Sequence, residues 1–289
     1  MGLTVLGSRT EIPMKRIPGT HLYSIPATVG GNHDARLIFD TGIGPSIVSG
    51  NFAERVHCRP VGETFTGRRM SGQEVTMPLV SIESLAVGPV FRENAIVGSF
   101  DIFGEGTQMP EGFAGIEGFL SPVFFEGIPF TLELAKERIL VESKQSLSLI
   151  RKTGKSVPLK IERDGPSVTM FIDLLLPDGE VAVVEVDTGS DILILNKRYM
   201  HRLGIEKSGS ATTKIEGKDE TGRSYVRYRA PVSGLVYLES HHDLYQTAPE
   251  VMFQEIIYDG LVGVDLLKRY AVTFNTAGSE LIFNRPQRE

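Results

Sequence analysis

Two short loops in the sequence carry residue types that can hydrolyse a peptide bond. Asp40-Thr41-Gly42 and Asp187-Thr188-Gly189 repeat one triplet, each directly after a mostly apolar run. Two carboxylates held close together cannot both ionise easily, so such a pair shares one proton. One carboxylate would act as general base on a water molecule and the other as general acid toward a carbonyl oxygen, and the roles then exchange. We therefore predict that Asp40 and Asp187 form a catalytic pair, and the sequence leaves open which of them carries the proton.

The residues beside the two aspartates suit this chemistry, but they differ between the loops. Gly42 and Gly189 let the backbone turn and approach the carboxylates closely. Ser190 follows the second triplet, where its hydroxyl can hydrogen-bond Asp187 and favour the ionised form. Ile43 occupies the same place in the first loop and has no hydroxyl. The sequence thus predicts an asymmetric pair.

The elements around the two triplets also repeat, which indicates a duplicated unit. Each triplet is followed by an apolar run and then by a short helix-like segment. Each copy next has a hairpin signal, Ser71-Gly72 in the first and Thr221-Gly222 in the second. Further on, Glu117–Leu120 corresponds to Asp259–Val262, and from there the copies run without a gap to Phe130–Leu132 and Val272–Phe274.

The pattern of the chain is that of a mainly β protein. Alternating or β-branched segments predict strands, and glycine-rich turns separate them. The clearest predicted strands are residues 22–29, 35–39, 75–87, 167–176 and 180–186. Helical periodicity is confined to short stretches at 51–56 and 197–203, and the polar stretch 144–160 is typical of a linker. We predict an all-β fold with short helices in two lobes, residues 1–150 with an extension over 1–20, and residues 151–289, with the active site between them.

The paired triplets and their spacing resemble the retropepsin and pepsin-like aspartic peptidases, over roughly residues 20 to 285. The likeness is strongest to bacterial retropepsin-like sequences, which have short lobes and no disulfides. It implies duplicated β-barrel lobes and a flap hairpin over the cleft. It also implies that Thr41 and Thr188 hydrogen-bond between the two loops. The residues predicted for the flaps are Met70, Ser71, Gly72, Thr221 and Gly222.

The first lobe departs from the family pattern at several places. Ile43 stands where the family has a small residue, and Ser121 occupies the place of Gly263. An alternative alignment of that element uses Ala114–Gly118, with poorer spacing to the next strand. The first-lobe flap also has no tyrosine. These departures bear on substrate range and rate more than on the type of reaction.

Composition and isolated motifs narrow the remaining functions. The net charge of −6 and the scattered basic residues argue against nucleic acid as a partner. The single cysteine, Cys58, allows no internal disulfide and lacks an evident activating base. His241-His242 has no metal-site spacing, so neither a metal nor a cofactor is predicted. With no signal-like or membrane-spanning segment, we expect a cytoplasmic protein.

The resemblance predicts an aspartic endopeptidase that acts as a monomer, since both loops lie in one chain. Its partner would be a peptide or protein substrate, bound as an extended strand in the cleft. The alternative is a binding module that captures peptides on the same fold without cutting them. The departures at Ile43 and Ser121 motivate that alternative, and the intact triplet in both lobes argues against it.

Overall fold

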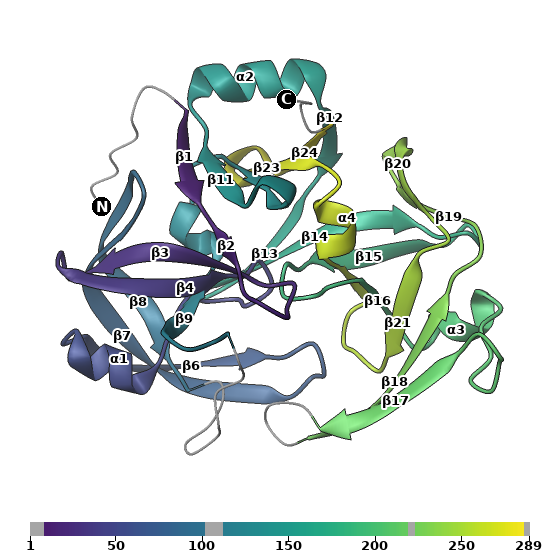
Figure 1. Ribbon diagram of the computed structural model, residues 1–289, viewed down its shortest axis with the longest axis horizontal. Helices are drawn as coiled ribbons and strands as arrows, with labels where there is room; N and C mark the ends of the chain where they lie inside the picture. Colours follow the sequence, from purple (N-terminus) through teal and green to yellow (C-terminus); the bar gives the residue numbers. More distant parts are fainter. Residues whose placement is uncertain (1–8, 102–111, 219–222, 286–289) are drawn as a thin grey trace.

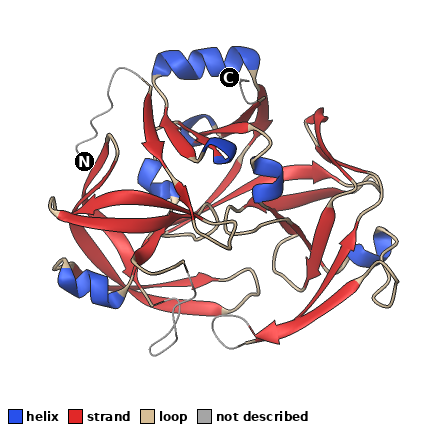
Figure 2. Ribbon diagram, viewed as in Figure 1, coloured by secondary structure: helices blue, strands red, loops and turns tan. Residues whose placement is uncertain are grey.

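The computed structural model describes residues 9–101, 112–218 and 223–285, and the chain folds into two lobes of strands joined by a third sheet (Figure 1). Figure 2 shows that strands dominate and that the helices are short, apart from one at the periphery. This arrangement confirms the predicted all-β, two-lobed fold. None of the described helices has the length and apolar character required to cross a membrane.

The first lobe is built on an eight-stranded sheet. Its strands, in their order across the sheet, are β2 (Lys15–Arg16), β3 (Tyr23–Val29), β4 (His33–Phe39), β9 (Ile116–Leu120), β5 (Ile47–Val48), β8 (Val90–Ser99), β7 (Glu74–Val87) and β6 (Arg59–Arg68). In β4, residues 37–39 are all buried, since this central strand packs against a core cluster on each face. The strands predicted at 22–29, 35–39 and 75–87 are confirmed.

The second lobe repeats the plan with a ten-stranded sheet. Its main path is β17 (Thr213–Lys218), β18 (Ser224–Pro231), β21 (Glu250–Gln254), β16 (Leu193–Asn196), β22 (Gly260–Val262), β15 (Val181–Val186), β14 (Ser167–Leu175), β19 (Leu235–Leu238) and β20 (His241–Thr247), with β13 (Lys160–Asp164) paired to β14. The predicted strands at 167–176 and 180–186 are confirmed.

Matching strand pairs show that the two lobes are copies of one unit. In the first lobe β4 runs parallel to β9, and in the second β15 runs parallel to β22. The strands that follow the two triplets, β5 and β16, also pair in corresponding ways, parallel to β8 and β21 and antiparallel to β9 and β22. Each triplet therefore emerges from a central, buried strand that is hydrogen-bonded on both sides.

A six-stranded sheet takes strands from both halves of the chain. Its order is β1 (Thr10–Pro13), β11 (Arg138–Val141), β10 (Phe130–Glu133), β23 (Ala271–Asn275), β24 (Glu280–Asn284) and β12 (Lys155–Pro158). At its centre the repeated segments pair with each other, Thr131 opposite Thr273 and Phe130 opposite Phe274. The two phenylalanine rings stack at 4.8 Å. The two lobes are thus joined where their corresponding strands, β10 and β23, pair with each other.

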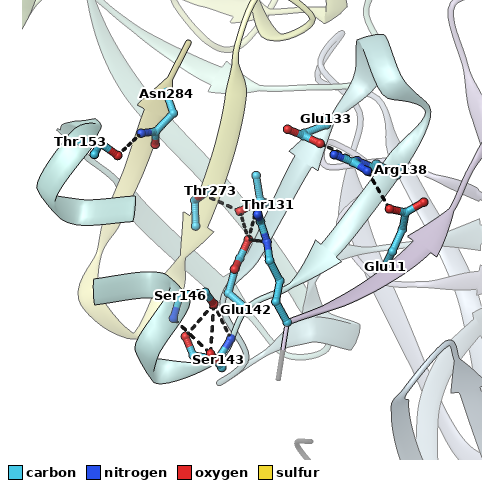
Figure 3. A network of polar contacts seen from close by, with 11 residues as sticks. Glu11, Thr131, Glu133, Arg138, Glu142, Ser143, Ser146, Thr153, Thr273 and Asn284 are labelled. Carbon is cyan, nitrogen blue, oxygen red and sulfur yellow. Dashed lines mark hydrogen bonds and ion pairs between the residues drawn. The ribbon is translucent and has the colours of Figure 1, made fainter. Parts of the chain in front are cut away.

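Buried polar contacts link the strands of this sheet (Figure 3). The hydroxyls of Thr131 and Thr273 are 2.7 Å apart, and Thr131 also donates to Glu142. Glu142 is 1% exposed and forms an ion pair with Arg9, at a nitrogen–oxygen distance of 2.9 Å. Because a buried carboxylate requires such partners, this network fixes how β1, β10 and β23 are joined.

The helices are α1 (Gly50–Arg55), α2 (Lys144–Thr153), α3 (Tyr199–Arg202) and α4 (Val264–Leu267), with 3-10 turns at Pro122–Phe125, Leu134–Lys136 and Thr276–Gly278. α1 and α3 lie in the two segments predicted to be helical. The linker prediction for residues 144–160 is wrong, because α2 and β12 occupy this stretch. α2 begins with a reciprocal cap between Ser143 and Ser146, and its composition is polar with no residue buried.

Residues 10–17, within the predicted extension, pack against the sheets. β1 is an edge strand of the six-stranded sheet, β2 pairs with β3, and both Ile12 and Ile17 are fully buried. The predicted boundary between residues 150 and 151 stays a prediction, since α2 spans it.

Candidate active site

The two triplets meet where β4 and β15 end. Asp40 and Asp187 are 7% and 8% exposed, and their carboxyl groups hydrogen-bond each other. Each carboxylate also accepts a hydrogen bond from its own loop, from Gly42 N to Asp40 Oδ1 at 2.8 Å and from Gly189 N to Asp187 Oδ1 at 2.7 Å. The structure therefore brings together the two aspartates that the sequence singles out.

Two buried threonines lock the loops to each other. Thr41 N donates to Thr188 Oγ1 at 3.0 Å, and Thr188 N donates to Thr41 Oγ1 at 2.9 Å. Each hydroxyl then donates to a carbonyl of the opposite lobe, Thr41 to Val186 O at 2.7 Å and Thr188 to Phe39 O at 3.3 Å. All four bonds cross between lobes, as the resemblance implies. They hold the carboxyl groups at a fixed separation.

The triplet glycines are required by how closely the loops approach. A Cβ on Gly42 would lie 2.4 Å from Asp187 Oδ1, and a Cβ on Gly189 would lie 2.8 Å from Asp40 Oδ2. Both distances are shorter than a nonbonded carbon–oxygen contact. Glycine at these two positions therefore allows the carboxyl group of the opposite lobe to come within hydrogen-bonding reach.

The environment of the pair favours one shared proton and assigns it to one side. Burial raises the pKa of Asp40 well above 3.8, and the neighbouring Asp187 carboxylate raises it further. Burial also raises the pKa of Asp187, but hydrogen bonds from Ser190 and from the Gly189 amide oppose the increase. We infer that Asp40 holds the proton and donates it to an ionised Asp187.

The asymmetry predicted from Ser190 and Ile43 is present in the hydrogen bonds. Ser190 Oγ donates to Asp187 Oδ2 at 2.6 Å. Ile43 offers Asp40 no such donor, and its side chain lines the cavity beside the pair. The two halves of the site therefore share a backbone plan and differ in the residue after the triplet.

A cavity of about 340 Å³ opens above the carboxyl groups, between the lobes. Asp40, Gly42–Pro45, Phe65, Gly67–Met70 and Phe119 line it from the first lobe, and Ser167, Thr169, Glu185, Asp187, Gly189, Ser190, Tyr258 and Leu261 from the second. Its walls are largely apolar with polar groups on the catalytic loops, as in sites that bind organic ligands.

The hairpin of β6 and β7 covers this cavity, as predicted for the first-lobe flap. Its turn is closed by Gly72 N donating to Arg69 O at 2.8 Å, with Gly72 at a φ of 79°. The tip reaches the second lobe, where Ile257 N donates to Met70 O at 2.9 Å. Ser71 lies at this tip, and its hydroxyl is buried with no partner among the described residues. The second predicted flap signal, Thr221-Gly222, lies outside the described residues, but the strands β17 and β18 on either side of it pair as a hairpin.

The departure at Ser121 has a local explanation. Its hydroxyl donates to the Gly44 carbonyl, and its amide donates to Ser46 Oγ at 3.0 Å. In the second lobe a Cβ on Gly263 would lie 2.4 Å from Ser190 O, so that lobe needs glycine. The first-lobe loop leaves room for the Ser121 side chain, whose hydrogen bonds stabilise the loop.

Two residues at the site have no counterpart in the sequence predictions. His21 Nε2 lies 2.7 Å from the Gly189 carbonyl oxygen, and the charge of His21 lowers the pKa of Asp187. No local pattern signals this contact, which joins residues 168 apart. Glu185 lines the cavity two residues before Asp187, and strand alternation was a signal that could have found it.

The residues set aside on sequence grounds lie away from the cavity lining. Burial raises the pKa of the Cys58 thiol, which keeps it protonated and a poor nucleophile. His241 Nε2 lies 2.9 Å from the Ser156 carbonyl, at the edge of β20. Within residues 9–101, 112–218 and 223–285, no group of three or more His, Cys, Asp or Glu side chains is placed to hold a metal ion.

Comparison with known proteins agrees with this site. Residues 25–116, which include Asp40 and the first-lobe flap, match the family model described as aspartyl protease. No curated protein sequence matches the chain.

Solved structures share the fold over nearly the whole chain. An aspartic proteinase from Irpex lacteus has a TM-score of 0.58 at 10% identity, covering 96% of this chain and 97% of that one. Basic 7S globulin from soybean has a TM-score of 0.57 at 11% identity, covering 96% of each chain. Conglutin gamma from lupine seeds has a TM-score of 0.54 at 12% identity, covering 96% and 95%. Residues 25–116 are thus similar to an aspartyl protease, and the chain as a whole shares the fold of these solved structures.

Proposed function

We propose that the protein is an aspartic endopeptidase that hydrolyses peptide bonds with Asp40 and Asp187. The observation that carries this proposal is the buried, mutually hydrogen-bonded pair of carboxyl groups at the base of a cavity between the lobes. A fold that only bound peptides would gain nothing from burying two carboxyl groups side by side, because their mutual repulsion costs free energy.

The roles of the two aspartates follow from their surroundings. Asp187, whose ionised form is stabilised by Ser190 and Gly189, acts as general base and takes a proton from a water molecule. Asp40, which holds the shared proton, donates it to the carbonyl oxygen of the scissile peptide bond as the carbonyl carbon becomes tetrahedral. The proton gained by Asp187 then passes to the leaving amine as the carbon–nitrogen bond breaks. Asp40 takes back a proton from a hydroxyl of the tetrahedral intermediate, and the pair returns to its starting state. Both loops belong to one chain, so we propose that a monomer is active.

The flap and the cavity walls suit a peptide in extended form. β6 and β7 lie over the cavity, and exclusion of water beneath them strengthens the electrostatic interactions at the reacting centre. The substrate's backbone would add a strand beside the flap, while its side chains occupy the spaces between the lobes.

The test is cleavage of a diverse peptide mixture from mildly acidic to neutral pH, with products identified by mass spectrometry. Asp40→Asn and Asp187→Asn are each expected to lower the cleavage rate by about 100-fold to 10,000-fold, the usual contribution of a general acid or base. Asp164→Asn is the matched control, because Asp164 is exposed and lies on β13, and it should cleave like wild type. Equal cleavage by wild type and Asp187→Asn would refute the proposal.

A peptide-binding protein without activity is the second candidate, since globulins from soybean and lupine share the fold. It predicts that folded wild type binds peptides from the same mixture and leaves them intact at every pH. The intact triplet in both loops and the four bonds between them favour the peptidase.

A further inference from the structure

Glu185 places a third carboxyl group in the cavity. It lies on β15 two residues before Asp187, and alternate residues of a strand face the same side. Val184 and Val186 face the other side and are fully buried in the core. Glu185 lines the same cavity as both aspartates and is close enough for their charges to act on it. A substrate side chain that reaches Glu185 therefore lies beside the scissile bond.

The Glu185 carboxyl group has no hydrogen-bond or ion-pair partner among the residues that the structure describes. It is 5% exposed, and no described residue forms a hydrogen bond or an ion pair with it. Burial and repulsion from Asp187 and Asp40 raise the pKa of Glu185 well above 4.5, with no opposing contact. Arg68 lines the same cavity but is paired with Glu74 on the flap, 3.3 Å away. Burial therefore favours the neutral acid, and a cationic ligand beside it would favour the ionised form.

The walls around Glu185 suit a long side chain that ends in a positive charge. Phe171 lies opposite Glu185 on β14, and its ring meets Tyr258 edge to face at 5.2 Å. The Tyr258 ring lines the cavity and offers apolar surface to a methylene chain, with Phe171 packed behind it. Thr169 hydrogen-bonds the Tyr258 hydroxyl, and burial together with Glu185 raises the pKa of Tyr258 to about 12, so the phenol stays neutral. Glu185 is the group of this pocket that can become negative when a cationic side chain reaches it.

The fold does not require an acid at this position. The corresponding residue of the first lobe, two before Asp40, is Ile38, which is fully buried against Ile17 and Ile116. The same strand in the other copy is therefore stable with an apolar residue. The glutamate is a feature of the second lobe alone, on the side that faces the cavity.

We propose that Glu185 is the anionic group of a subsite that selects a lysine or arginine side chain next to the scissile bond. This inference rests on the proposed peptidase function for its effect on cleavage, but the subsite itself is a property of binding. The ammonium or guanidinium group would pair with the Glu185 carboxylate, and the methylene stem would lie along the Tyr258 ring. Such a side chain would also offset the charge of the aspartate pair.

The cleavage test uses peptides that differ at one position beside the cut bond. That position holds lysine, norleucine or glutamine, since norleucine retains most of the lysine stem without its charge. Wild type should favour lysine over norleucine in kcat/KM by at least ~10-fold, the factor given by one charged hydrogen bond. Glu185→Gln should lower this ratio by a similar factor. Glu206→Gln, which removes an exposed glutamate elsewhere in the second lobe, should leave the ratio as in wild type.

A binding test separates failure of the subsite from failure of the proposed function. Asp187→Asn protein is dialysed to equilibrium against an equal mixture of octapeptides with lysine, norleucine or glutamine at a central position, and the bound fractions are measured by mass spectrometry. Enrichment of the lysine peptide, lost in Asp187→Asn/Glu185→Gln, supports the subsite even if wild type cuts nothing. Preference for norleucine or glutamine by Asp187→Asn protein, or a lysine preference that survives Glu185→Gln, would overturn it. The peptide preference of the Asp187→Asn protein needs no change at Glu185, so this readout tests the subsite even if Glu185→Gln does not fold.

Discussion

Replacement of Thr41 by valine tests whether the bonds between the two loops stabilise the protein as the geometry indicates. The change keeps the branched shape and removes only the hydroxyl, which is fully buried. That hydroxyl accepts from Thr188 N at 2.9 Å and donates to Val186 O at 2.7 Å. Thr41→Val therefore leaves one buried N–H and one buried carbonyl without partners.

The expected loss can be estimated from these two groups. An unpaired buried polar group costs about 1–3 kcal/mol, so two of them lower the free energy of unfolding by about 2–4 kcal/mol after some relaxation. Thr188→Val removes a comparable pair, but the bond from its hydroxyl to Phe39 O is longer, at 3.3 Å. We expect Thr188→Val to cost less than Thr41→Val, about 1–3 kcal/mol. Against a typical total of about 5–15 kcal/mol, either loss is large.

Urea unfolding followed by fluorescence or circular dichroism measures the difference. Thr66→Val is the matched control, because Thr66 is exposed, and its hydroxyl contact with Thr76 on the flap is open to water. Its free energy of unfolding should stay within about 0.5 kcal/mol of wild type, as is usual for surface substitutions. A Thr41→Val protein that loses no more than Thr66→Val would refute the account of the loops as a buried, coupled network.

Three further predictions concern the aspartate pair. Ser190→Ala removes the hydrogen bond that favours ionised Asp187, so the acid limb of the kcat/KM profile should move to higher pH; an unchanged limb would contradict the assigned base. Gly42→Ala places a Cβ 2.4 Å from Asp187 Oδ1, so peptide cleavage should be lost even where circular dichroism shows a folded protein, and retained activity would show that the loops can separate. Asp40→Asn should raise the free energy of unfolding near neutral pH by about 0.5–2 kcal/mol. The reason is that the raised pKa of Asp40 makes the folded state bind more protons than the unfolded chain above pH 3.8, so the gain should vanish as the pH falls below that value. A gain that persists in urea titrations at pH 3 would contradict this cause.

The sequence was most informative where the chemistry is local and repeated. The two triplets, the strands before them and the first-lobe flap signal follow from short patterns, and their duplication supplies the register between the lobes. The asymmetry between Ser190 and Ile43 was visible for the same reason, since each residue directly follows its triplet. These features depend on neighbours in the chain, which a sequence shows directly.

The features that sequence reasoning missed depend on contacts between distant segments or, for α2, on a helix that has no buried residue. His21 reaches the second catalytic loop only because β2 and β3 carry it there, and a single histidine gives no spacing to interpret. α2 has no buried residue, so its polar sequence was mistaken for a linker although Ser143 and Ser146 cap it. β1 pairs with β11, which lies far along the chain, and no local pattern indicates that pairing.

Three polar groups near the site are found only on the side that belongs to Asp187. Ser190, His21 and Glu185 each add a polar or charged group there, whereas the first lobe has Ile43 and Ile38 at the two matching positions. A symmetric pair of loops would leave the shared proton equally on either carboxyl group. Because the Ser190 hydroxyl donates to Asp187 and Ile43 offers Asp40 no such donor, the proposed mechanism has a distinct base and a distinct acid before substrate arrives. Such a division is open to a single chain with two lobes, in which each copy of the loop can change independently, and it is closed to an assembly of two identical subunits.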